Sequence, residues 1–147
     1  MITEADDARF ELLASGKRAF AFLEERDATV HVADSVSRSI LAYLLTSAAF
    51  EVEYDWRERA VFVLACRGDE AARRGGYYTF EGRRARVHLL QALEYARLSD
   101  GTLRKKLRAI QRRSGLEAMP SQVEVFATVL EERLDALLDR YDSVFPQ

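Results

Sequence analysis

The sequence predicts an α+β protein in which a small antiparallel β-meander, at about residues 39–66 with a further piece at 77–86, packs against N-terminal and C-terminal helices. Two observations predict this class. Two β-type runs meet at a charged turn in the middle of the chain, and apolar residues recur at helical spacing towards both ends. The chain has 147 residues, of which 48% are hydrophobic, and this suits one domain over residues 1–147 with one core.

The two central runs are predicted to be neighbouring strands of different character. Residues 51–56 alternate strictly between acidic and apolar side chains, which is typical of a strand with one wet and one buried face. Residues 60–66 are apolar at almost every position, as expected for a strand that is covered on both sides. The charged residues 55–59 between them are the predicted turn.

Residues 34–49 allow two interpretations. If Asp34 or Ser35 caps a helix, that helix directly precedes the hairpin, which is the order of elements in a winged-helix protein. If residues 39–46 instead form a strand that turns at Ser47 and Ala48, three strands make a meander. We favour the meander, and residues 28–32 then add a short, β-branched edge strand.

The N-terminal helix is predicted to run to about Arg26, with Gly16 as a candidate kink. Its expected buried stripe comprises Phe10, Leu13, Phe20 and Leu23. Towards the middle of the chain, residues 77–80 are predicted to form a strand and residues 81–82 a tight turn. The strands expected at 28–32 and at 77–80 complete the predicted sheet.

Three helices are predicted in the second half of the chain. Residues 86–97 show helical spacing, and Ser99 or Asp100 then caps a further helix that stops at Gly115. Ser121, with Glu124 three residues later, fits a capping box, so the last helix is expected to begin there.

Composition excludes several classes of site. The single cysteine, Cys66, excludes an internal disulfide bond and a cysteine-based zinc site. No apolar stretch approaches the roughly 20 residues of a membrane-spanning helix, so no membrane partner is expected. The first residues are acidic where a signal peptide would be basic, and we therefore expect a cytoplasmic protein.

The side chains that catalysis needs do not form a recognisable set. His31 and His88 are the only histidines, and neither has a second ligand at metal-binding spacing. Phosphate-binding loops and nucleophile motifs are also missing from the sequence. The sequence therefore predicts a protein that is not an enzyme, with no catalytic, metal-binding or cofactor-binding residues.

Charge is distributed unevenly along the chain. Residues 1–66 carry a net charge of −5, residues 67–116 carry +8 and residues 117–147 carry −5. The arginine-rich middle segment suits phosphate or clustered carboxylates, because the guanidinium group makes two parallel hydrogen bonds. The candidate patch for a nucleic acid or an acidic partner lies within residues 67–113 and comprises Arg73, Arg74, Arg83, Arg84, Arg104, Lys105, Arg108 and Arg112. The alternative is that these side chains only solvate the surface.

Three segments of the chain resemble small immunity-type proteins of bacterial polymorphic-toxin systems. They are the run Phe20-Ala-Phe-Leu23, the meander pattern through residues 43–64 and the terminal helical run 126–138. This resemblance implies a non-enzymatic protein that binds and blocks a cognate toxin.

The turn between the two central strands is the predicted partner-binding site under this hypothesis. Its residues are Glu53, Asp55, Trp56, Arg57 and Glu58. A desolvated tryptophan with charged neighbours is a typical anchor at protein interfaces. The alternative for Trp56 is that it closes one end of the core.

Two other functions remain as alternatives. One is a nucleic-acid-binding module that uses the basic segment. The other is a helical accessory subunit or a homodimer that pairs through the helix at 121–145. On that helix Val125, Val129 and Leu138 widen the apolar face beyond one stripe.

Overall fold

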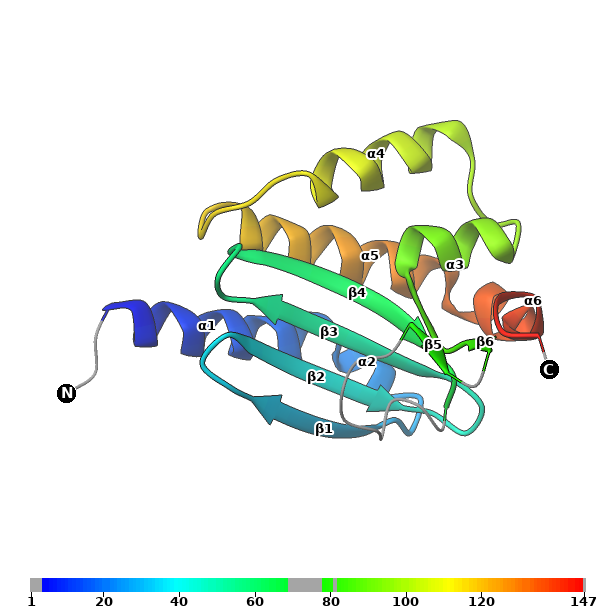
Figure 1. Cartoon of the computed structure of the whole chain (residues 1–147), viewed down its shortest axis with the longest axis horizontal. Coiled ribbons are helices and arrows are strands. Elements are labelled where there is room, and N and C mark those ends of the chain that lie inside the picture. The colour runs from blue at the N-terminus through cyan, green and yellow to red at the C-terminus, as the bar shows by residue number, and fades with distance from the viewer. Residues whose placement is uncertain (1–3, 69–77, 81, 147) are drawn as a thin grey trace.

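The computed structural model describes residues 4–68, 78–80 and 82–146 of the chain. Its strands lie in front of a layer of helices in the view of Figure 1. The helices are α1 (Glu4–Ala19), α2 (Ala21–Glu24), α3 (Leu89–Tyr95), α4 (Gly101–Gln111), α5 (Ala118–Asp139) and α6 (Tyr141–Val144). The strands are β1 (Thr29–Asp34), β2 (Arg38–Leu44), β3 (Ala49–Asp55), β4 (Ala60–Cys66), β5 (Thr79–Phe80), β6 (Arg83–Arg84) and β7 (Arg86–His88).

The main sheet has five strands in the order β1-β2-β3-β4-β7, and every neighbouring pair is antiparallel. The predicted α+β class and its meander are therefore confirmed. The winged-helix alternative is wrong, because residues 38–44 form strand β2 and not a helix. Leu41 and Tyr43 are fully buried on the face that the helices cover, while Ile40 and Ala42 lie on the other face. An apolar run of this kind suits a strand with little exposure on either face.

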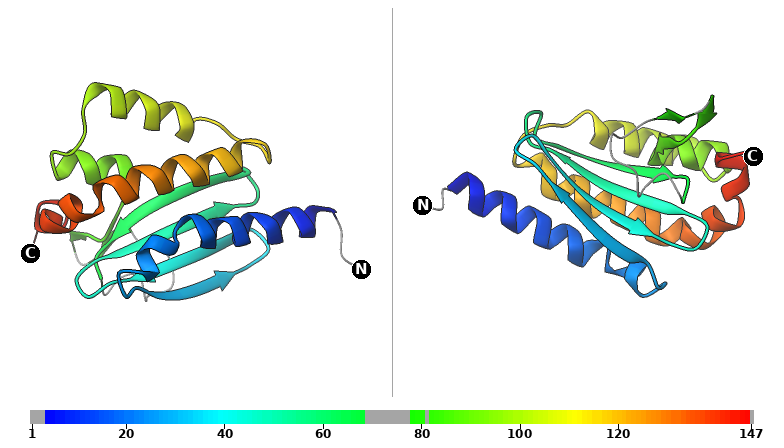
Figure 2. Two further views of the ribbon diagram at one scale, coloured as in Figure 1. Left: turned by 180° about the vertical axis from the view of Figure 1, so that it is seen from behind. Right: turned by 60° about the horizontal axis from the view of Figure 1, so that its bottom comes forward.

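Helices cover one face of the sheet, as the view from behind in Figure 2 shows. The central helix α5 packs against α1, α3, α4 and β4, and α4 lies outermost in the helix layer. The core between the two layers is rich in large aromatic side chains, which bury a large apolar area each. They include Phe20, Tyr43, Phe50, Tyr54 and Phe126, each with no measurable exposure.

Helix α1 continues through Gly16, so the predicted kink is wrong. A Cβ atom at this position would lie 1.8 Å from the hydroxyl oxygen of Tyr54. That hydroxyl donates a hydrogen bond to the backbone oxygen of Leu12, 3.0 Å away. The glycine therefore lets the helix approach β3 closely, and it does not interrupt the helix.

Two predicted helix boundaries are also wrong. Residues 86–88 form strand β7, and the helix begins only at Leu89, because the backbone of β7 is paired with residues 64–66 of β4. The last helix begins at Ala118, so Ser121 lies inside its first turns and makes no cap. The cap predicted at Asp100 is present, since its carboxylate accepts a 2.8 Å hydrogen bond from the Leu103 amide.

The apolar residues that were expected to widen the exposed apolar face of the last helix pack in or against the core. Val129 is buried in the core, and Val125 and Leu138 pack against it while partly exposed. This helix therefore keeps little of that face for pairing with a second chain. Among the described residues, no helix combines the length and the hydropathy that crossing a membrane requires.

Candidate protein-binding surface

Four segments meet at one end of the molecule, which we call the turn end. They are the N-terminal half of α1, the β1–β2 turn at 35–37, the β3–β4 turn at 56–59 and the α4–α5 connection at 112–117 (Figure 1). Hydrogen bonds hold these segments together. The Gly115 amide donates to the backbone oxygen of Arg59 at 2.8 Å.

Arg9 connects α1 to the β1–β2 turn. Its guanidinium group forms an ion pair with Asp34 and donates to the backbone oxygens of Ser35 and Val36. Because one side chain bonds to several groups of the turn, the turn is fixed against the helix. The turn end is thus built from loops that are already held in place before any partner binds.

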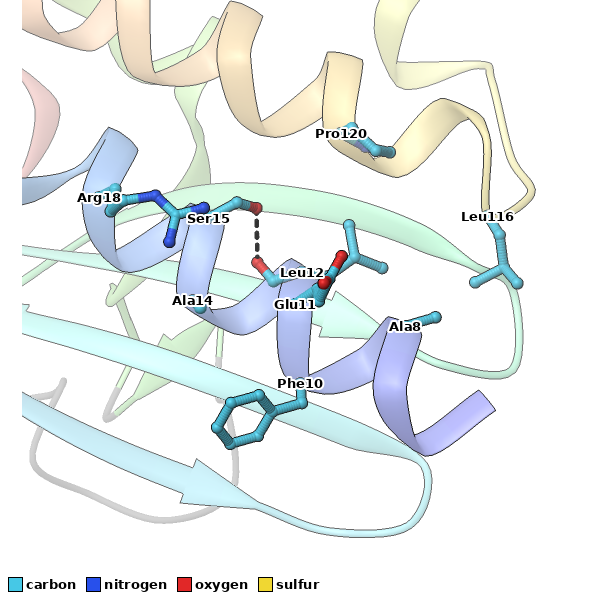
Figure 3. A pocket seen from close by; sticks show the side chains of 9 residues that line it. All are labelled: Ala8, Phe10, Glu11, Leu12, Ala14, Ser15, Arg18, Leu116 and Pro120. Carbon is cyan, nitrogen blue, oxygen red and sulfur yellow. Dashed lines mark hydrogen bonds between the residues drawn. The ribbon is translucent and has the colours of Figure 1, made fainter. Parts of the chain in front are cut away.

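Exposed apolar side chains gather at the turn end. Phe10 is 75% exposed, Val36 is 92% exposed and Leu116 is 40% exposed. Exposed apolar groups that gather at one place often mark an interaction site, whereas scattered ones carry no meaning. The expectation that Phe10 points into the core is wrong, because its ring projects from the side of α1 that faces away from Leu116 and Pro120 (Figure 3).

A hollow of about 600 Å³ runs along α1 towards the α4–α5 connection. In Figure 3 it lies between α1 and the loop that carries Leu116, with Pro120 at the start of α5 beside it. Its floor includes Leu12 and Ser15, and the Ser15 hydroxyl donates to the backbone oxygen of Leu12 at 3.0 Å. A second hollow of about 160 Å³ shares Leu116 and is lined by Asp6, Arg9, Trp56 and Arg59.

Trp56 has a structural role at the turn end. Its ring stacks on Tyr54 with centroids 5.3 Å apart, and its indole nitrogen donates to the Ser39 hydroxyl at 2.8 Å. The Arg9 guanidinium carbon lies 5.0 Å from the ring centroid on the outer side, within the range of a cation–π contact. The structure therefore supports the interpretation that Trp56 closes one end of the core.

The other predicted partner-binding residues separate into two groups. Asp55 holds the turn, because its carboxylate accepts 3.0 Å hydrogen bonds from the amides of Arg57 and Glu58. This leaves the side chains of Arg57 and Glu58 exposed at the turn end. Glu53 lies elsewhere, on the face of the sheet away from the helices, where Arg38 is 3.2 Å from it.

That second face of the sheet is not uniformly wet, so the predicted character of residues 51–56 needs a correction. Glu51 is buried and forms a two-point ion pair with Arg86 at 2.9 and 3.1 Å. Their side chains are 5% and 2% exposed. A carboxylate is buried in this way only when an ion-pair partner offsets the loss of hydration. The alternation therefore identified the strand correctly but not the partner that allows Glu51 to be buried.

Three titratable side chains beside this pair have shifted pKa values. Burial raises the pKa of Glu53 above its ordinary value, although Arg38 opposes the shift. Burial also lowers the pKa of His88 and raises that of the Cys66 thiol. The His88 ring contacts Phe62 and Tyr78 with centroid distances of 5.7 and 5.9 Å. Within the part of the chain that is described, no three acidic, histidine or cysteine side chains are grouped as a metal site would require.

The residues of the predicted basic patch are only partly brought together. Arg84 stacks over Tyr95 with its guanidinium carbon 3.7 Å from the ring centroid, and Arg104 pairs with Glu94 at 2.9 Å. Arg84 and Arg104, which were expected to meet a partner, therefore already interact with residues of this chain. Arg83 is exposed on β6. Arg73 and Arg74 lie outside the described residues.

Helix α4 keeps a basic outer face. The side chains of Leu103, Leu107 and Ile110 face inward, and the exposed positions carry Lys105, Lys106, Arg108, Arg112 and Arg113 at the helix and its end. None of these five cations forms an ion pair with a described residue. Lys106 and Arg113 were absent from the predicted patch, although the helical periodicity of 101–113 was sufficient to place them.

The fold defines an α+β protein in which helices cover one face of an antiparallel meander sheet. No protein-family model, curated protein or solved structure matches the chain.

Proposed function

We propose that this chain is a non-enzymatic protein-binding module of the inhibitor type, which binds and blocks a cognate bacterial toxin through the turn end. The observation that carries the proposal is the group of exposed apolar side chains there, Phe10, Val36 and Leu116. Phe10 and Leu116 line the larger hollow, and Val36 and Leu116 lie on loops that hydrogen bonds tie to the rest of the protein. An inhibitor needs a rigid surface of this type, because ordering loops on binding costs affinity.

Charged side chains around these apolar groups support the same proposal. Arg57 and Glu58 are exposed on the β3–β4 turn, and Arg59 is exposed beside them. Interfaces commonly combine an apolar centre with a charged rim, where the rim sets the rate of association and the choice of partner. The turn end carries both kinds of side chain.

The direct test is co-expression with the product of the adjacent gene in the source genome. We expect that product to co-purify with this chain and to lose its toxicity when the chain is present. Phe10→Asp should weaken the complex at least tenfold, because a carboxylate would enter the apolar centre of the interface. The affinity is measured by calorimetry or surface plasmon resonance.

Gln91→Asp provides the matched control, since Gln91 is exposed on α3, away from the turn end. This variant should bind like the parent. If both variants bind equally well, or if the adjacent product neither associates nor is inhibited, the proposal fails.

A second candidate function is favoured by the outer face of α4. The five cations on the helix and at its end, which form no ion pair with a described residue, suit a polyanion such as duplex nucleic acid. We expect any such binding to weaken steeply between 50 and about 200 mM salt, as counterion release requires. Fluorescence anisotropy with duplex and single-stranded oligonucleotides measures it. An unchanged signal with every oligonucleotide at low salt removes this candidate.

A further inference from the structure

The two edges of the main sheet differ in how they are protected. At one edge β7 pairs with residues 64–66 of β4, and the side chain of Gln122 accepts a 2.8 Å hydrogen bond from the Val61 amide. Further along the same edge, the backbone oxygen of Arg59 is bonded to Gly115. Among the described residues, nothing covers the β1 edge in this way. Every residue of β1 except Val30 is exposed, and no described residue forms a backbone hydrogen bond to its outer side.

The register of β1 and β2 shows which backbone groups are free. The Ser35 amide donates to the Arg38 oxygen at 2.8 Å, so these two residues form a hydrogen-bonded pair next to the turn. Hydrogen-bonded and non-bonded pairs alternate along an antiparallel ladder. From the pairing Asp34–Ser39, Val32–Leu41 and Val30–Tyr43, the amides and carbonyls of Val30, Val32 and Asp34 point away from the sheet.

The sequence of β1 contains no residue that would prevent another strand from pairing with this edge. Proteins usually protect an exposed edge with proline, lysine, a bulge or a covering loop. Residues 29–34 read Thr-Val-His-Val-Ala-Asp and contain neither proline nor lysine. The one acidic side chain, Asp34, lies at the end of the strand and is held by Arg9 and Ser39. The central Val32 is 52% exposed.

We propose that a second copy of this chain pairs antiparallel with β1, with the twofold axis at Val32. This register places Val32 opposite Val32 of the second copy and Val30 opposite Asp34 of the second copy. It is the register in which all three outward-facing residues of each strand form hydrogen-bonded pairs. His31 then lies opposite Ala33 of the second copy, so no like charges meet across the axis. The two sheets become one continuous ten-stranded sheet.

This pairing is independent of the proposed function, because it uses the backbone of β1 and not the apolar centre of the turn end. Light scattering after gel filtration should give twice the 16.8 kDa mass of one chain at high concentration, falling on dilution. Val32→Lys should raise the dissociation constant at least tenfold, because two ammonium groups would lie directly opposite each other. Gln91→Lys is the control, since Gln91 is exposed on α3, away from β1. A chain that stays monomeric, or a dimer that Val32→Lys leaves intact, would overturn the proposal.

Cross-linking tests the register without weakening the dimer. In a hydrogen-bonded antiparallel pair the Cα atoms are about 5.5 Å apart, which is within the range for a disulfide bond. Val32→Cys should therefore form a covalent dimer on mild oxidation, while Val36→Cys should not. The only native cysteine, Cys66, is buried and does not compete. If Val36→Cys cross-links and Val32→Cys does not, the twofold axis does not lie at Val32.

Discussion

Gly16 shows how one missing side chain sets the distance between α1 and the sheet. In an ordinary helix interior, Gly→Ala stabilises a protein by about 0.5–1 kcal/mol. Here the new methyl group would lie 1.8 Å from the Tyr54 hydroxyl, so we expect Gly16→Ala to destabilise the protein by about 1–3 kcal/mol. Chemical denaturation measures this. Adding Tyr54→Phe should recover part of the loss, and an equally unstable double variant would contradict the steric explanation.

The buried pair Glu51–Arg86 should behave as a unit. Removing one partner leaves an uncompensated charge inside the protein, so Glu51→Ala and Arg86→Ala should each cost about 3–5 kcal/mol of the free energy of unfolding. The Glu51→Ala, Arg86→Ala double variant should cost clearly less than the two single changes added together. Arg38→Ala is the comparison, since Arg38 is 49% exposed and its pair with Glu53 should contribute about 1 kcal/mol at most. Equal losses at Arg86 and Arg38 would contradict this prediction.

His88 should make stability depend on pH. Its folded pKa is lowered by burial, so between the ordinary value near 6.5 and the folded pKa the unfolded chain binds more protons than the folded one. The free energy of unfolding should therefore fall as pH decreases below about 6.5. His88→Phe keeps a ring beside Phe62 and removes the titration, so its unfolding curves from pH 7 to about 5 should show a smaller decline. An unchanged slope would assign the pH dependence to other groups.

At the scale of elements, Gln122 joins three parts of the fold. Its side chain accepts from the Val61 amide on β4 and donates to the backbone oxygens of Ile110 and Arg113 at 3.0 and 2.8 Å. Gln122→Leu would leave these buried groups without partners, and we expect a loss of at least about 2 kcal/mol. Hydrogen exchange should show faster exchange of the Val61 amide than in the parent. Protection that stays at the level of the parent would show that another group replaces the glutamine.

The sequence alone predicts the elements that are determined by residues close together in the chain. Alternation in residues 51–56 identified β3, and Asp100 identified the start of α4. It was insufficient where contacts distant along the chain decide the outcome. Residues 86–88 have helical spacing but pair with β4, and Glu51 has the pattern of a wet position but meets Arg86 from 35 residues away.

The candidate surface was predicted only in part for the same reason. Asp55, Arg57 and Glu58 lie in one turn, so their proximity could be read from the sequence. Phe10 and Leu116 are more than a hundred residues apart, and only the docking of α1 beside the α4–α5 connection brings them to one end. Periodicity assigned Phe10 to the buried stripe, but the spacing alone does not show which side of α1 the neighbouring elements cover.

At the scale of the whole molecule, one apolar cluster extends from Leu12 to Phe145 and includes residues from both layers. Helix and sheet should therefore unfold together in a single transition. Far-ultraviolet circular dichroism and the fluorescence of Trp56, the only tryptophan, should give the same midpoint in urea. Two separate midpoints would show that the turn end around Trp56 opens before the rest.

The position of α5 in the chain has a consequence for synthesis on the ribosome. The strands β1 to β4 pair with their chain neighbours, so the meander is complete by residue 66. The helix that covers much of its apolar face spans residues 118–139 and is therefore among the last parts to emerge. The nascent sheet thus keeps part of its apolar face uncovered while residues 67–117 are synthesised, and uncovered apolar surface of this kind favours aggregation.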